Sequence, residues 1–260
     1  LYTTCQDSYT VLESHPILVV PTAQIISFTG GDGLVQQKGN KLVYGPFHQL
    51  EPNAYHELKC HFESTAPLIT VTQLDRDLQV SHWGNNLAVE EHYAIRNDGA
   101  ELEENFNRVR YMVSSQVHSA TNMLKELTLE LPAGASDAYF RDEIGNVSTS
   151  HFRQERDRSV LEIKPRFPLF GGWTYNWYHG YNVKLGAFLR TFDGQYILNV
   201  NFVENAKVMT IDHARLRIVL PEGATDVQVH TPMALDSIQH SKHFTNFDST
   251  GRYQIILEKK

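Results

Sequence analysis

Cysteine is scarce in this chain: only Cys5 and Cys60 occur among its 260 residues. A disulfide framework of the kind that holds small secreted domains together needs several pairs, so that class of protein is excluded. Two cysteines could form one disulfide in an oxidising compartment or remain two thiols. The sequence leaves both alternatives open.

Basic residues and long apolar runs are also few. The chain has 23 Lys and Arg against 30 Asp and Glu, a formal net charge of -7. Nucleic acid is therefore not expected as a partner, because it demands a basic face. No run approaches the roughly 20 apolar residues that cross a bilayer. The chain does not begin with Met and shows no signal segment, so we expect a soluble piece of a longer protein.

What the chain does have is strand alternation. Apolar and polar residues alternate with a period of two in several short runs, which is typical of half-buried strands. The clearest runs are "LITVTQL" from Leu68, "LAVEEHYAI" from Leu87 and "YILNVNFV" from Tyr196. Only "VHSATNMLKEL" from Val117 fits a helix, and a strand fits it as well. We predict an all-β chain of antiparallel sheets packed as sandwiches.

One near-repeat supports this prediction. "LTLELPAGASDAYF" from Leu127 and "LRIVLPEGATDVQV" from Leu216 both read as strand, turn, strand. The proline of each copy ends the ladder because it lacks a donor, and the glycines Gly134 and Gly223 supply the turn. We expect two similar strand–turn–strand units within one sandwich.

The domain boundary is predicted from a change in pattern. The first part of the chain is irregular and contains the glycine-rich "TGGDG" from Thr29, whereas regular alternation begins near Thr70. We therefore expect two parts, residues 1–75 and 76–260. The first part is too short and irregular to form a whole domain.

Motifs for catalysis are weak. Asp75-Arg76-Asp77 matches the Asp-x-Asp pattern of nucleotide-sugar transferases, and in a strand both carboxylates would share a face. Such a short pattern is common, however. "HELKCH" from His56 departs from the zinc-protease motif, since Cys60 replaces the second His. We expect no catalytic residue and no cofactor or metal, and keep a metal-dependent sugar transferase using Asp75 and Asp77 as the alternative.

The run "KPRFPLFGGW" from Lys164 is unusually apolar for a loop, because Pro168 and two glycines break any regular element. Its apolar side chains are a candidate interaction surface: Phe167, Leu169, Phe170 and Trp173. We expect Phe167 and Phe170 to anchor the loop while Trp173 lies near the surface. A carbohydrate-binding module is a further alternative, with sugar rings stacking on Trp173, Tyr175, Trp177 and Tyr178.

Several longer strings resemble one known family. They are "VSHWGNNLAVEE" from Val80, "RDEIGNVSTSHF" from Arg141 and "IKPRFPLFGGW" from Ile163. Together they resemble the ribophorin I family, the large non-catalytic subunit of the eukaryotic oligosaccharyltransferase complex. The resemblance runs from about residue 44 to the end, and residues 1–43 depart from it most.

The resemblance implies a protein of the endoplasmic reticulum lumen with two successive β domains, similar in fold to the non-catalytic β domains of zinc aminopeptidases. Residues 1–75 would end the first domain and 76–260 would form the second, with a membrane anchor absent from this chain. It implies a non-catalytic role in complex assembly and in handling nascent polypeptides. The implied partners are the other subunits, including the multi-spanning catalytic one. Asn146, in Asn-Val-Ser, matches the family's glycosylated position.

Overall fold

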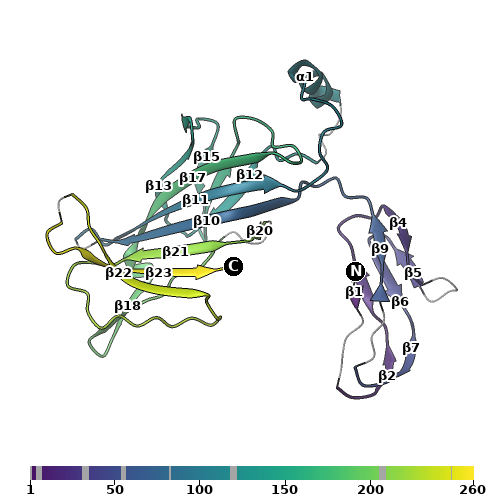
Figure 1. Ribbon diagram of the computed structural model, residues 1–260, viewed down its shortest axis with the longest axis horizontal. Helices are drawn as coiled ribbons and strands as arrows, with labels where there is room; N and C mark the ends of the chain where they lie inside the picture. The colour runs from purple at the N-terminus through teal and green to yellow at the C-terminus, as the bar shows by residue number, and fades with distance from the viewer. Residues whose placement is uncertain are drawn as a thin grey trace. The chain divides into compact units, whose positions relative to one another are not determined.

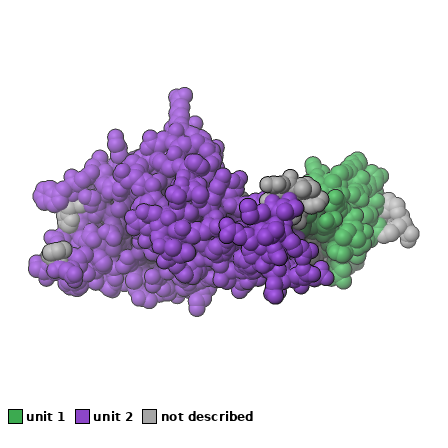
Figure 2. All heavy atoms as spheres, turned by 90° about the horizontal axis from the view of Figure 1, so that it is seen from above, with its two compact units in different colours: residues 1–65 green, residues 66–260 purple. Residues whose placement is uncertain are grey.

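The computed structural model describes residues 2–3, 8–30, 35–53, 57–81, 83–117, 122–204, 209–246 and 248–260. The chain divides into two compact units, Leu1–Thr65 and Ala66–Lys260, coloured separately in Figure 2. Strands dominate both units (Figure 1). No described helix is long and apolar enough to cross a membrane.

The first unit is built from short antiparallel strands. β1 (Tyr2–Thr3) pairs with β8 (Glu57–Leu58), β2 (Val11–Ser14) with β7 (Phe47–Leu50), and β4 (Ile25–Phe28) with β9 (Cys60–Phe62). A three-stranded sheet has the order β3 (Ile17–Val19), β6 (Lys41–Tyr44), β5 (Val35–Lys38). The unit has its own small core: Leu18, Val20, Leu42, Tyr44 and Leu58.

The second unit contains a large sheet, with the order β14-β13-β17-β11-β10-β21-β23-β22 and β20 beside β10. Its strands are β10 (Ile69–Val80), β11 (Asn86–Asn97), β13 (Ser136–Asp142), β14 (Gly145–Asn146), β17 (Thr174–Lys184), β20 (Thr210–Ile211), β21 (Ala214–Val219), β22 (Ser237–His243) and β23 (Arg252–Lys259). All of its pairings are antiparallel except those of β10 with β20 and β21.

Smaller elements complete this unit. A three-stranded sheet has the order β12 (Leu127–Leu131), β16 (Ser159–Ile163), β15 (His151–Gln154), and β18 (Leu189–Phe192) forms a hairpin with β19 (Gln195–Leu198) after the 3-10 turn η1 (Leu185–Ala187). One core cluster contains side chains of both the large and the three-stranded sheet, among them Leu129, Leu161 and Trp177. The two sheets therefore pack face to face. The prediction of an all-β antiparallel sandwich is confirmed.

The units divide at Thr65, ten residues before the boundary expected from the sequence. β10 runs without a break from Ile69 to Val80, and its Leu74 and Leu78 are buried in the core of the second unit. A boundary after residue 75 would cut this strand in the middle. The sequence before Ile69 has no regular alternation, so the predicted boundary was placed too late in the chain.

The near-repeat holds for its turns. Gly134 and Gly223 both have φ of 77°, and the N–H of the next residue donates to the proline carbonyl of the same turn in each copy. Only the first copy continues directly into a strand, β13. After Gly223 the next strand, β22, begins at Ser237, so the predicted second strand of that copy does not form.

Two further predictions differ from the structure. The strand expected from Tyr196 ends at Leu198, and Tyr196 is 74% exposed instead of facing a core. The only described α-helix, α1 (Arg108–Val117), ends where the sequence suggested that one begins. Most of the first turn of the stretch expected from Val117 lies outside the described residues.

Candidate functional site

Asn97 positions the apolar loop 164–173. It ends β11, and its buried Nδ2 donates to the carbonyls of Leu169 (3.0 Å) and Asn122 (2.9 Å). Leu124 and Leu169 exchange two backbone hydrogen bonds of 3.0 and 2.9 Å. A buried amide satisfied on two sides fixes the loop, since leaving its donors unpaired would cost about 1 to 3 kcal/mol. Leu169 is consequently part of the core rather than of a surface.

The glycine pair of the loop allows a close approach of two backbones. A Cβ on Gly171 would lie 2.1 Å from the carbonyl oxygen of Ala100, and one on Gly172 would lie 2.9 Å from Oε1 of Glu101. Gly172 also has φ of 77°, in the left-handed region. These glycines are therefore needed for packing against the segment that follows β11.

An aromatic cluster surrounds the loop, consisting of Phe106, Tyr111, Phe167, Phe170, Trp173 and Tyr175. Ring centroids lie 5.3 Å apart for Phe170 and Trp173, and 5.5 Å apart for Phe106 and Phe170, in the tilted and edge-to-face arrangements that aromatic pairs prefer. Phe170 is buried, as expected for an anchor. Phe167 is 39% exposed, contrary to the expectation, although its ring contacts those of Trp173 and Tyr175.

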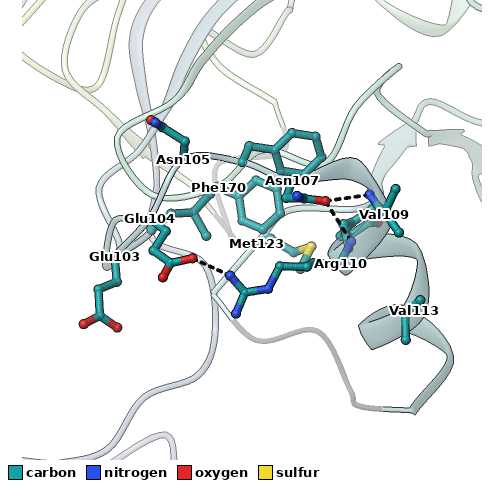
Figure 3. A pocket seen from close by; sticks show the side chains of 12 residues that line it. Glu103, Glu104, Asn105, Asn107, Val109, Arg110, Val113, Met123 and Phe170 are labelled. Atoms are coloured by element: carbon teal, nitrogen blue, oxygen red, sulfur yellow. Dashed lines mark hydrogen bonds and ion pairs between the residues drawn. The ribbon is translucent and has the colours of Figure 1, made fainter.

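Exposed apolar side chains continue from this cluster onto α1, which projects from the sandwich where β11 ends (Figure 1). Asn107 caps the helix, because its Oδ1 accepts the N–H groups of Val109 and Arg110, both at 3.0 Å. We call the following residues the α1 surface: Leu102, Phe106, Val109, Met112 and Val113, all exposed. Four of them line the hollow beside Phe170 in Figure 3.

Sequence reasoning missed the α1 surface. The signals were present, namely a capping Asn107 and apolar residues at Val109, Met112 and Val113, a helical spacing of three and four. They were too short to stand out beside the strand patterns.

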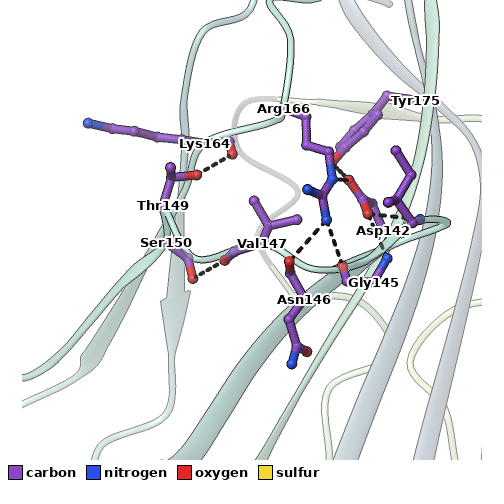
Figure 4. A network of polar contacts seen from close by, with 10 residues as sticks. Asp142, Gly145, Asn146, Val147, Thr149, Ser150, Lys164, Arg166 and Tyr175 are labelled. Carbon is purple, nitrogen blue, oxygen red and sulfur yellow. Dashed lines mark hydrogen bonds and ion pairs between the residues drawn. The ribbon is translucent and has the colours of Figure 1, made fainter.

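Asn146 lies in the tight β13–β14 hairpin shown in Figure 4. Asp142 closes it: its Oδ1 accepts the N–H groups of Ile144 (3.0 Å) and Gly145 (3.1 Å), and its Oδ2 accepts the Tyr175 hydroxyl (3.0 Å). Burial opposes ionisation of Asp142, but these hydrogen bonds and the Arg166 guanidinium outweigh it, so the pKa of Asp142 is lowered. The side chain of Asn146 is exposed.

The Asp-x-Asp pair does share one face of β10, but arginines occupy both carboxylates. Arg217 binds Asp77 through two hydrogen bonds, Nε to Oδ1 at 2.7 Å and Nη2 to Oδ2 at 2.6 Å. Arg215 forms an ion pair with Asp75 at 2.9 Å. The parallel pairing of β10 with β21 aligns each Asp with its Arg. Within the described part of the chain, no three His, Cys, Asp or Glu side chains are grouped so that they could hold a metal ion.

The other candidate residues are not brought together. His56 of "HELKCH" lies outside the described residues, as does Cys5, so its pairing with Cys60 does too. Tyr175 and Trp177 are buried on the inner face of the large sheet, where Trp177 stacks on Tyr93 at 4.4 Å. These two rings cannot form the sugar platform that the sequence allowed.

A buried ionic network crosses the inner face, and sequence reasoning missed it. Arg76 on β10 is 3% exposed and lies 2.9 Å from Glu91 and 2.7 Å from Glu204, both through carboxylate Oε1. The Glu91 contact is not aligned as a hydrogen bond, but Tyr93 donates to Glu91 Oε2 at 2.8 Å. Tyr181 likewise donates to Glu204 at 3.1 Å. Burial lowers the pKa of Arg76, but the charges of Glu91 and Glu204 outweigh this effect, so the pKa of Arg76 is raised.

His179 completes this network. It is fully buried, neither ring nitrogen has a hydrogen-bond partner, and Nε2 lies 3.5 Å from Glu91 Oε2. Burial and the nearby charge of Arg76 lower the pKa of His179 to about 3. The imidazole is therefore neutral near pH 7.

Two packed sheets, a network of paired buried charges and an exposed apolar helix define a β-sandwich module. The family model named Ribophorin I matches residues 2–260, and the chain belongs to the Ribophorin I family.

Relatives carry names from one enzyme complex. The chain is 35% identical over 96% of its length to "Dolichyl-diphosphooligosaccharide--protein glycosyltransferase subunit 1A" of Arabidopsis thaliana, and covers 40% of that protein. It is 33% identical over 97% of its length to subunit 1B of Oryza sativa subsp. japonica, covering 53% of it. To subunit 1 of Caenorhabditis elegans it is 36% identical over 86% of its length, covering 38%. The chain thus spans about two fifths to one half of these relatives.

Among solved structures, the chain is similar to an M1 zinc metallopeptidase from Deinococcus radiodurans at 13% identity. The match has a TM-score of 0.38 and covers 74% of this chain and 39% of that one. A likeness this remote carries no argument about a site or an activity.

Proposed function

We propose that this chain is a luminal, non-catalytic part of a subunit of the oligosaccharyltransferase complex, supporting N-linked glycosylation by complex assembly and by handling nascent polypeptides. Membership of the Ribophorin I family and the names of the relatives support this proposal. Residues 1–65 would end a first luminal β domain and residues 66–260 would form the second. The proposed location is the lumen of the endoplasmic reticulum, with a membrane anchor elsewhere in the protein.

The observation that carries an assembly role is the α1 surface. Scattered exposed apolar residues are normal, but here five of them belong to or adjoin an aromatic cluster that is fixed from beneath by Phe170 and Leu169. A rigid apolar surface loses little conformational entropy on binding. We propose that the other subunits of the complex, including the multi-spanning catalytic one, contact this surface together with Phe167 and Trp173.

Charge substitution on the α1 surface tests the assembly role. Val109→Asp with Val113→Asp in the full-length protein should leave folding intact, because both side chains are exposed, yet lower co-purification of the other subunits. Tyr196→Asp is the control, since Tyr196 is equally exposed on β19. If the double variant recovers the complex as well as this control does, the α1 surface is not the contact.

The metal-dependent sugar transferase has a separate test. Asp75→Ala and Asp77→Ala should leave glycan transfer by the assembled complex nearly unchanged, because each carboxylate already binds an arginine. A large loss of transfer at unchanged protein level, together with a bound divalent metal in the purified protein, would restore that alternative.

We also propose that Asn146 carries an N-linked glycan when the protein is made in a secretory pathway. Its exposed amide in an Asn-Val-Ser hairpin meets the requirement that a bulky hydrated group faces solvent. Glycosidase digestion should lower the mass of the protein, and Asn146→Gln should abolish that shift. An unchanged mass on digestion of material from eukaryotic cells contradicts the proposal.

A further inference from the structure

Asn146 stands at the end of a row of side chains that crosses the large sheet. It is opposite Arg141 on β13, which is opposite Tyr178 on β17; Tyr178 is opposite His92 on β11, and His92 is opposite Asp75 on β10. The next row, in which Arg76, Glu91 and His179 are neighbours, is the buried one. Since strand neighbours alternate between faces, the row from Asn146 to Asp75 lies on the outer face, away from the core.

Arg141 fixes the Asn146 amide in a way that suits a glycan. Its Nε donates to Oδ1 of Asn146 at 2.7 Å, whereas a glycan is joined to Nδ2, so both can be present together. A cation–π contact holds Arg141 in place, because its guanidinium lies 5.0 Å from the ring centroid of Tyr139. Tyr139 in turn covers Gly180, where a Cβ would come within 2.2 Å of the hydroxyl.

Beyond Arg141 the row passes a shallow hollow on the outer face. Among the polar residues that line it are Gln73, Asp75, His92, Glu143, Asn176 and Tyr178. Within the described structure, Oδ2 of Asp75, Oε2 of Glu143 and Oδ1 of Asn176 have no hydrogen-bond partner. These are acceptors for hydroxyl groups, and they line the same hollow as the half-buried Tyr178, whose ring stacks on His92 with one face at 4.8 Å. A ligand with many hydroxyl groups and an apolar face, such as a sugar, fits this set.

Distance decides which sugar can reach the hollow. Neighbouring strands are about 4.8 Å apart, so Tyr178 lies roughly 10 Å from Asn146 across two strands and Asp75 roughly 19 Å across four. We propose that the glycan on Asn146 folds back along this row, with its first sugars against Arg141 and Tyr178 and later hydroxyl groups on Glu143, Asn176 and Asp75. This inference rests on the proposed glycosylation of Asn146. The glycan would then form a third layer over the exposed face of the sheet.

The test uses the full-length protein from a secretory pathway. Intact mass first establishes whether Asn146 carries a glycan. The rate of glycosidase cleavage is then measured under native conditions for the parent, for Tyr178→Ala with Glu143→Gln, and for the control Tyr196→Ala. Loss of contacts equal to about one hydrogen bond should speed cleavage in the double variant by up to about tenfold, while the control cleaves like the parent.

A measurement without substitutions keeps the inference testable if the variant does not fold. The N-acetyl methyl resonances of an isotope-labelled glycan should be broad, like those of the protein, if the first sugars are held against the sheet. Sharp resonances, or equal cleavage rates in all three proteins, would contradict packing of the glycan against the sheet but would leave the proposed glycosylation of Asn146 standing. No glycan on Asn146 would overturn both.

Discussion

Replacing Arg76 by Met is the most informative perturbation of the core. Met keeps an unbranched apolar side chain of similar length, so the change removes charge more than volume. It leaves Glu91, 1% exposed, and Glu204, 10% exposed, without their shared cation. Removing one partner of a buried ion pair costs about 3 to 5 kcal/mol, because the remaining charge stays buried and uncompensated.

Arg217→Met is the matched control, since Arg217 binds Asp77 on the outer face with 29% of its side chain exposed. A pair on that face contributes at most about 1 kcal/mol. Urea unfolding of the chain should therefore show a several-fold larger loss for Arg76→Met than for Arg217→Met. A triple change of Arg76→Met, Glu91→Gln and Glu204→Gln should recover much of the loss, because no buried charge remains unpaired.

Equal losses for the two single Met variants would refute this reasoning. They would mean that water or a rearranged Glu204 segment solvates the carboxylates once Arg76 is gone. Failure of the triple variant to recover, with a large loss for Arg76→Met, would instead assign the cost to packing rather than charge.

Two further predictions concern the same unit. The pKa of His179 is lowered to about 3 in the folded chain, whereas in the unfolded chain the imidazole binds a proton near pH 6.5. The free energy of unfolding therefore decreases as the pH is lowered below about 6.5. The loss between pH 7 and pH 5 should be about 2 kcal/mol for this group, and urea unfolding of His179→Gln should lack that increment. Phe170→Ala should cost about 3 to 5 kcal/mol in urea unfolding, as a buried aromatic, whereas Trp173→Ala should cost less but weaken co-purification of the complex. A parent-like Phe170→Ala would show that the loop is not anchored by this ring.

The sequence predicted the architecture where burial follows a simple rule. β10 and β11 bury alternate residues along almost their whole length, so their period of two was visible in the sequence. The turn at Gly134 was predictable for the same local reason, since only a residue tolerant of positive φ fits there.

The alternating pattern did not reveal the buried ionic network or the contacts that fix the apolar loop. Arg76 and Glu91 occupy inward positions, so a polar residue stood where the pattern calls for an apolar one, and only their pairing across β10 and β11 explains it. The hydrogen bonds of Asn97 to Leu169 and Asn122 join segments far apart in the chain. No local pattern reports such contacts, because they depend on which strands become neighbours.

The apolar loop 164–173 and α1 together form an exposed apolar surface that is supported by buried side chains. An aromatic loop can be rigid only if part of it is buried, and Leu169 and Phe170 supply that buried part. Leu169 and Phe170 pack toward the core, whereas Phe167, Trp173 and the α1 surface lie on the side toward solvent. The sequence placed the candidate interaction surface on the loop alone; we propose that this surface extends from the exposed Phe167 onto α1. A partner that binds there would contact a surface already fixed from beneath, so the affinity would depend on the fit of the partner rather than on ordering of the loop.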